Sequence, residues 1–136
     1  MKLKVKALRE GAKLPTRGTT GSAGLDLYCV ENTPLTQEPR KVPTGIAIEI
    51  PEGYVGLIQT RSSAALFGIT VFTTVVDSDY RGELFVTAKA SGKTVAGAGS
   101  RLAQLVLLPL PVFEPEWAEE LSKTERGSGG YGSTGV

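Results

Sequence analysis

Short apolar runs separated by glycine and proline dominate this chain, and apolar residues rarely recur at the spacing of a helical face. Short strands at such spacing indicate an all-β sandwich or barrel. One short helix is expected over Glu116 to Leu121, with Pro115 at its start. The strands predicted by the pattern are Leu3–Ala7, Leu25–Val30, Gly45–Ile50, Tyr54–Thr60, Ile69–Phe72, Glu83–Ala90 and Leu102–Val112.

The last of these strands has an unusual pattern, because Leu102 to Leu108 is apolar at both odd and even positions apart from Gln104. A strand that is apolar on both faces needs cover on both sides. In so small a protein, another subunit can supply part of that cover.

The 136 residues correspond to one domain, without a repeat or an internal linker. The net charge of +1 gives no electrostatic reason to expect a nucleic acid or a membrane as partner. The single cysteine, Cys29, excludes an intrachain disulfide and suits a reducing compartment. The longest apolar run, Leu105 to Leu110, is too short to cross a bilayer, and the N-terminus lacks the apolar block of a secretory signal. We therefore expect a cytoplasmic protein, or one in another reducing intracellular compartment.

The chain contains no histidine, which removes several mechanisms. A Ser-His triad, a histidine base and the zinc site of the nucleobase deaminases cannot be built. Acid–base chemistry must fall to Asp, Glu, Lys or Tyr. Any metal would be a hard cation held by carboxylate, water and phosphate oxygens.

The densest set of reactive groups lies in Val75–Leu84. Two valines favour a strand, Asp77-Ser78-Asp79 has turn chemistry, and the chain after Gly82 reads as a return strand. The pattern predicts a hairpin that presents two carboxylates, a phenol and a guanidinium. The alternative is a solvated hairpin tip.

Two earlier stretches carry polar groups beside predicted strands. Asp26 points away from Leu25 and Leu27, and it could hold a hydrated metal ion or simply face solvent. Arg61, Ser62 and Ser63 stand at the start of a short helical turn, where an arginine, hydroxyls and backbone N–H groups suit phosphate. The alternative is a capping serine beside a surface arginine.

Two later stretches complete the set. Gly99–Gln104 places an arginine and a glutamine at the mouth of the most buried strand, for a ligand or for a structural hydrogen bond. The glycine-rich segment 126–136 has almost no apolar mass and is expected to be mobile when free. Arg126 and Tyr131 could clamp a phosphate and stack on a base, unless the segment is a frayed tail.

Together the stretches AGLDLY, RSSAALFGI, VVDSDYRGEL, GSRLAQL and RGSGGYGSTG resemble, in order, the five motifs of the trimeric dUTPases. The resemblance spans nearly the whole chain. It implies a distorted jelly-roll-like β fold and a homotrimer whose active sites lie between subunits. It also implies Mg²⁺-assisted hydrolysis of dUTP to dUMP and pyrophosphate. The division implied is a β domain over 1–125 and a mobile arm over 126–136 that closes a neighbouring active site.

The resemblance also assigns roles to residues of this chain. Asp77 would activate the water that attacks the α-phosphorus, Tyr80 would exclude a 2′-hydroxyl, and Asp26 would bind Mg²⁺ through water. Gln104 would support the phosphate and water site. The remaining substrate-binding residues would be Arg61, Ser62 and Ser63 for phosphate, Val71, Thr74, Val75, Val76 and Phe85 for the nucleoside, and Arg126, Tyr131 and Gly132 in the lid.

One departure concerns the arm that reads uracil, because many family members have Asn at the position of Val71 and Gly at that of Thr74. A threonine there could narrow the pocket. Two other functions stay open. The dCTP deaminases share this fold and an Arg-Ser-Ser stretch, but Thr87 occupies the position of their catalytic glutamate. A non-enzymatic partner-binding protein on the same fold is the third possibility.

Overall fold

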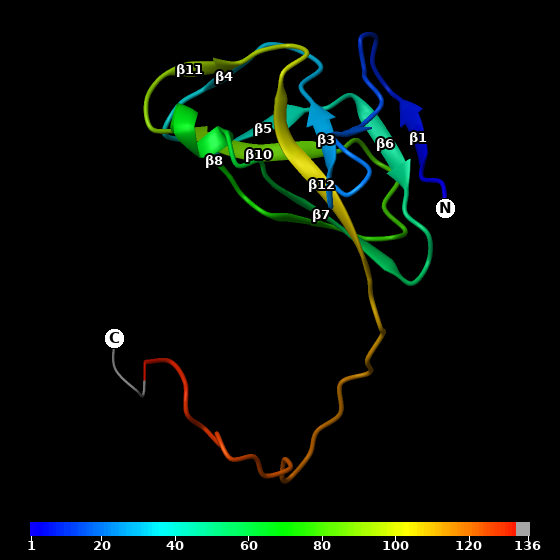
Figure 1. Cartoon of the computed structure of the whole chain (residues 1–136), viewed down its shortest axis with the longest axis vertical. Helices are drawn as coiled ribbons and strands as arrows, with labels where there is room; N and C mark the ends of the chain where they lie inside the picture. Colours follow the sequence, from blue (N-terminus) through cyan, green and yellow to red (C-terminus); the bar gives the residue numbers. More distant parts are fainter. Residues whose placement is uncertain (133–136) are drawn as a thin grey trace.

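The computed structural model describes residues 1–132, and the all-β fold expected from the sequence is confirmed (Figure 1). One short 3-10 helix, η1 (Ala64–Phe67), is present between the seventh and eighth strands. The strands are β1 (Lys4–Ala7), β2 (Thr16–Arg17), β3 (Leu25–Tyr28), β4 (Thr33–Leu35), β5 (Arg40–Pro43), β6 (Ile46–Glu49), β7 (Tyr54–Thr60), β8 (Ile69–Val71), β9 (Thr74–Val76), β10 (Phe85–Ala90), β11 (Thr94–Ala96) and β12 (Arg101–Pro109).

The strands form a distorted jelly-roll-like arrangement of antiparallel sheets. The largest sheet has the order β2-β3-β12-β7-β9, and a three-stranded sheet has the order β5-β10-β8. The pairs β1-β6 and β11-β4 complete the set. Leu27, Ile58 and Leu105 of the large sheet share one apolar core with Val42 and Val86 of the three-stranded sheet. Burial of this shared core stabilises the sheets as one unit.

Strand β12 lies at the centre of the large sheet, between β3 and β7. Its first half is buried, with Leu102 5% and Leu105 1% exposed. Its second half is more open, since Leu107 is only partly buried and Leu108 is 43% exposed. One chain therefore leaves apolar surface of β12 uncovered, as the two-sided pattern of this strand predicts.

The prediction of a helix over residues 116–121 is wrong. This segment is extended, and Trp117 and Leu121 are almost fully exposed. Six residues form too few hydrogen bonds to offset the cost of helix nucleation, and no surface of this chain packs against them. The predicted final strand also ends at Pro109 rather than Val112, because prolines at 109 and 111 cannot donate to a ladder.

The predicted hairpin around Val75–Leu84 is also wrong. Strand β9 pairs with β7, whereas β10 pairs with β5 and β8. The loop between β9 and β10 therefore crosses from the large sheet to the three-stranded sheet. Two adjacent valines and the apolar pattern after Gly82 correctly indicated strands on both sides of the loop, but such local signals do not specify which strands pair.

Cys29 is buried, and burial raises the pKa of its thiol, although a hydrogen bond from Ser100 has the opposite and smaller effect. The thiol is thus an unreactive part of the core. Among residues 1–132, no helix has the length and apolar character needed to span a bilayer.

Candidate active site

A pocket of about 260 Å³ opens between the end of β9 and the start of β10. Asp77 is exposed in its lining and directly follows β9. The other predicted site residues that line this pocket are Thr74, Val75, Val76, Tyr80 and Phe85. The structure therefore brings the carboxylate, the phenol and an aromatic ring to one place.

Tyr80 is held in this pocket by its own loop. Its hydroxyl donates a hydrogen bond to the backbone oxygen of Glu83 at 2.9 Å, and its backbone N–H donates to the oxygen of Asp77 at 3.2 Å. A Cβ at Gly82 would lie 2.4 Å from the Tyr80 hydroxyl oxygen and 2.6 Å from Cζ. The ring can occupy this position only because residue 82 has no side chain.

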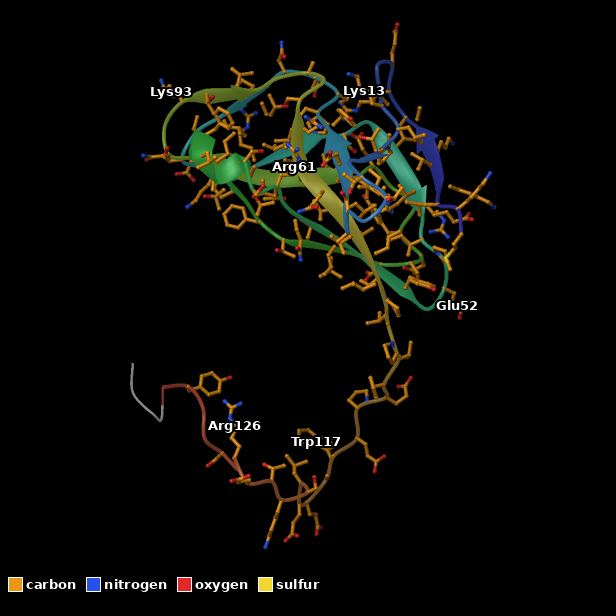
Figure 2. The ribbon with its side chains drawn as sticks, in the orientation of Figure 1. Lys13, Glu52, Arg61, Lys93, Trp117 and Arg126 are labelled. Atoms are coloured by element: carbon orange, nitrogen blue, oxygen red, sulfur yellow. The ribbon has the colours of Figure 1, made fainter. Side chains whose placement is uncertain are left out.

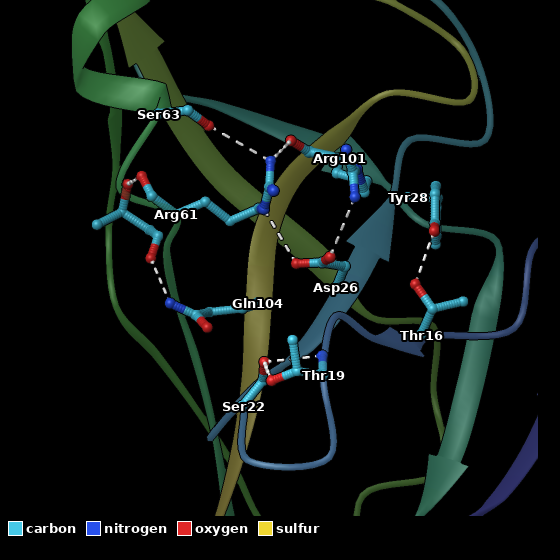
Figure 3. A network of polar contacts seen from close by, with 10 residues as sticks. Thr16, Thr19, Ser22, Asp26, Tyr28, Arg61, Ser63, Arg101 and Gln104 are labelled. Carbon is cyan, nitrogen blue, oxygen red and sulfur yellow. Dashed lines mark hydrogen bonds and ion pairs between the residues drawn. The ribbon is translucent and has the colours of Figure 1, made fainter.

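A second group of predicted residues forms a polar network around Asp26 of β3 (Figure 3). Arg61 Nε lies 3.0 Å from Asp26 Oδ1, and Arg101 Nη1 lies 3.5 Å from Oδ2. The Asp26 side chain is only 14% exposed, so both of its oxygens lie near a guanidinium in a partly desolvated site. The interpretation of Asp26 as a polar residue that simply faces solvent is wrong.

Arg61 is further fixed by the start of η1. Its Nη1 donates to Ser63 Oγ at 3.4 Å and to the backbone oxygen of Arg101 at 3.2 Å. Ser63 precedes η1 but its hydroxyl makes no capping hydrogen bond, so the capping interpretation is wrong for this residue. Ser62 is exposed beside it. The expected short helical turn is confirmed.

Gln104 joins the same network from β12. Its register partner on β3 is Asp26, and its Nε2 donates to the backbone oxygen of Thr60 at 3.0 Å. Gly24 is buried against it, since a Cβ there would lie 2.2 Å from Gln104 Oε1. The side chain is thereby turned toward the arginine end of β7.

The two groups lie at opposite ends of β7. Strands β7 and β9 are antiparallel, with Ile58 opposite Thr74 and Gly56 opposite Val76. Asp77 therefore continues past Gly56, whereas Arg61 follows Thr60 at the other end. At a rise of about 3.3 Å per residue, Asp77 and Arg61 of one chain lie roughly 20 Å apart. One chain does not bring the carboxylate of Asp77 to the Arg61 network.

The remaining predicted residues lie outside both groups. Val71 pairs with Ala88 within the three-stranded sheet and does not line the pocket. Arg126, Tyr131 and Gly132 lie in an extended arm that leaves the body after β12 (Figure 2). Arg126 Nε donates to the oxygen of Gly129 at 2.5 Å, and Tyr131 is fully exposed with φ 49°. The end of the predicted lid, 133–136, is outside the described residues.

The structure also adds residues that the sequence did not assign to a site. Lys41 and Glu83 line the pocket, and Lys41 Nζ lies 5.3 Å from the centroid of the Phe85 ring. No local pattern marks Lys41, because it reaches the pocket through the pairing of β5 with β10. Arg101, the arginine that the sequence places at the mouth of the most buried strand, takes part in the network around Asp26.

The donor set fits only one kind of magnesium site. Within residues 1–132, no group of three or more His, Cys, Asp or Glu side chains could enclose a metal. Asp26 is a lone carboxylate beside two arginines that suit phosphate. These residues would fit an ion held mainly by phosphate and water oxygens, in which Asp26 would accept a hydrogen bond from a water of the ion.

Residues 10–135 match the family model described as dUTPase. The chain belongs to the dUTPase family. It is 46% identical to the deoxyuridine 5'-triphosphate nucleotidohydrolase of Hydrogenobaculum sp. (strain Y04AAS1), over 100% of this chain and 99% of the relative. The corresponding protein of Anaplasma marginale (strain St. Maries) is 43% identical, with 98% and 99% covered.

Solved structures of dUTPases share the fold. The dUTPase of Staphylococcus bacteriophage 80alpha, in a G-to-S variant bound to dUpNHpp, superposes with a TM-score of 0.91 at 30% identity, covering 99% of both chains. A variant dUTPase of Staphylococcus aureus phage phi11 superposes with a TM-score of 0.83 at 29% identity, covering 88% of this chain and 98% of that one. The latter is described as revealing the coordination of a structural Mg(II) ion.

Gly82→Ala is predicted to displace Tyr80, because the new methyl group would overlap the phenol ring. The expected result is a KM for dUTP raised by roughly tenfold, with a smaller change in kcat. The matched control is Gly92→Ala, since a Cβ at Gly92 meets no atom within 4 Å. Steady-state kinetics of both variants test this, and an unchanged KM in Gly82→Ala would refute the tight fit.

Proposed function

We propose that this protein hydrolyses dUTP to dUMP and pyrophosphate, which supplies dUMP and limits uracil incorporation into DNA. The observation that carries the proposal is the pocket between β9 and β10, where Asp77, Tyr80 and Phe85 meet in a chain of the dUTPase family. Its lining combines a carboxylate with the flat faces of aromatic rings. The rings can pack against a nucleoside, and the carboxylate can hold a water molecule for hydrolysis beside it.

Asp77 is the proposed general base. It is exposed in the pocket and the chain has no histidine, so its carboxylate is available to orient the water that attacks the α-phosphorus. Tyr80 and Phe85 provide surfaces for the deoxyribose and the base. The backbone of Thr74 to Val76 is proposed to read uracil, whereas Val71, which does not line the pocket, would act only from outside it.

Arg61, Ser62, Ser63 and Gln104 are the proposed phosphate ligands. Phosphoryl transfer depends mainly on positioning and on neutralisation of charge, for which arginines, hydroxyls and backbone donors suffice. Magnesium, when bound, would neutralise phosphate charge, and Asp26 would hold its water shell. The same carboxylate also fixes the direction of Arg61, at 3.0 Å.

The two halves of this site are proposed to come from different chains of a homotrimer. The support is the separation of roughly 20 Å between Asp77 and Arg61 along β7. A second observation is the exposed apolar surface of the segment that follows β12. In this segment four apolar side chains are each more than 80% exposed: Val112, Phe113, Trp117 and Leu121. Side chains of this kind are covered in a stable assembly.

The domain formed by residues 1–125 is proposed to carry the segment 126–136 as a lid that closes an active site of a neighbouring chain. Arg126 would add charge-assisted hydrogen bonds to phosphate, and Tyr131 a flat face for the base. Gly132 adopts φ +80°, a conformation that glycine tolerates in a chain that must turn around a ligand.

The direct test of the function is incubation with each dNTP and with magnesium, following pyrophosphate and ammonia release separately. Only dUTP is expected to release pyrophosphate rapidly. Ammonia release from dCTP is not expected, because Thr87 in the pocket offers no carboxylate.

Asp77→Asn should retain the fold and lose at least ~10²-fold in kcat. Near-normal turnover in that variant would refute the assignment of the base.

Asp26→Asn separates two roles of this carboxylate. If Asp26 only orders the water shell of magnesium, excess Mg²⁺ restores the rate. Because it also fixes Arg61, we expect kcat/KM to stay at least ~10-fold low at saturating Mg²⁺. A magnesium titration of the unmodified protein and of Asp26→Asn measures this. Full recovery of kcat/KM in the variant would contradict the role of Asp26 in fixing Arg61 and would leave only its role toward the metal.

Sedimentation equilibrium is expected to give three times the chain mass of 14.3 kDa. A trimer would cover the exposed end of β12 and the apolar side chains of the segment that follows it, which one chain leaves open. A stable monomer with full dUTPase activity would contradict both the assembly and the shared site.

Removal of residues 126–136 is expected to leave the fold and the trimer intact, since this segment has little apolar surface to bury. Turnover of dUTP should fall strongly, because a phosphate ligand and the exclusion of water are lost. The measurement compares kcat/KM and thermal stability of the full and shortened chains. Equal kinetics would make the segment a passive tail, and a collapsed melting temperature would make it structural.

A further inference from the structure

Glu83 connects the nucleoside pocket to the N-terminal loop. Its side chain is only 13% exposed. Oε1 lies 2.9 Å from Arg9 Nε, and Oε2 accepts a hydrogen bond from the Gly45 N–H at 3.2 Å. Its backbone oxygen accepts the hydroxyl of Tyr80 at 2.9 Å. One residue therefore joins Arg9, which is 74 positions away in sequence, to the tyrosine of the pocket.

The partners of Glu83 are themselves fixed. Gly45 adopts φ +74°, and a Cβ there would lie 2.9 Å from a methyl carbon of Val30. The oxygen of Gly45 accepts the N–H of Leu8, next to Arg9, at 2.8 Å. On the other side, Leu84 donates its N–H to Ile46 at 2.8 Å. The carboxylate of Glu83 thus sits in a rigid frame made by two loops.

Tyr80 depends on this frame more than a core tyrosine would. It is 44% exposed, so packing alone does not immobilise its ring. The hydrogen bond to Glu83 and the contact with Gly82 are what hold it. An apolar surface such as the Tyr80 ring discriminates only weakly against a sugar with an additional hydroxyl group. That discrimination is lost if the ring can move away from the hydroxyl.

We propose that the Arg9–Glu83 ion pair positions Tyr80 and thereby sets the preference for deoxyribose over ribose. Arg9 and Glu83 are positioning residues, because Arg9 lies outside the pocket lining and the Glu83 carboxylate is bound to Arg9 and to the Gly45 N–H. Without Arg9, a largely buried carboxylate loses its cation, and the side chain turns toward water. The backbone at residue 83 shifts with it, because the carboxylate that anchored this residue to Arg9 and to the Gly45 N–H is released, and its oxygen moves away from the Tyr80 hydroxyl. The inference rests on the proposed function, in which Tyr80 packs on the sugar of dUTP.

The test compares kcat and KM for dUTP and for UTP in Arg9→Met, Arg9→Lys and Glu83→Gln. Arg9→Met and Glu83→Gln should raise KM for dUTP and lower the dUTP-to-UTP ratio of kcat/KM by roughly tenfold. Arg9→Lys should restore part of that ratio, because it keeps the charge. The matched control is Glu31→Gln, since Glu31 is the other carboxylate on Arg9 and is 56% exposed; its selectivity should equal that of the unmodified protein.

A double-mutant cycle distinguishes a specific effect on Tyr80 from a general loss of folding. Tyr80→Phe removes only the hydroxyl that Glu83 holds, so it should lower selectivity by itself. Arg9→Met added to Tyr80→Phe should lower it little further, because both act through one hydrogen bond. Additive losses, or equal changes for dUTP and UTP, would overturn the proposal. A lack of dUTP hydrolysis by the unmodified protein would refute the proposed function instead.

Discussion

The antiparallel register of β7 and β9 is the constraint on which the site depends. With Gly56 opposite Val76, Asp77 and Arg61 leave the sheet at opposite ends of β7. Side chains cannot bridge roughly 20 Å, so no movement of rotamers within one chain unites the proposed base with the proposed phosphate ligands. The same register that stabilises the sheet thus supports the proposal that the site is completed by a neighbouring chain.

Each half of the site is organised by one partly buried carboxylate. Asp26 binds Arg61 and Arg101 in the proposed phosphate half. In the proposed nucleoside half, the Glu83 carboxylate is anchored by Arg9, and the backbone oxygen of the same residue accepts the Tyr80 hydroxyl. Neither carboxylate needs to touch the reacting atoms to matter. Both convert long, mobile or exposed side chains into fixed ones, which is how an enzyme orients a charged substrate before the reaction begins.

Local patterns in the sequence predicted most strands, and the structure brings many of the predicted site residues together in two groups. They failed where the structure depends on distant partners. Strands β4 and β5 contain Pro34 and Pro43, which argue against a strand unless it lies at a sheet edge, as both do. The pairing of β9 with β7 depends on contacts that alternation does not encode. The pocket position of Lys41 and the Arg9–Glu83 pair have the same origin.

The most direct measurement of the shared site is a mixing experiment with two inactive variants, Arg61→Ala and Asp77→Asn. Equal amounts are denatured, refolded together and checked for mixed trimers by native mass spectrometry. If each site takes Asp77 from one chain and Arg61 from its neighbour, random mixing makes about a quarter of the sites intact, and dUTP hydrolysis returns. Mixed trimers that stay inactive would contradict the account, because both residues would then have to come from the same chain.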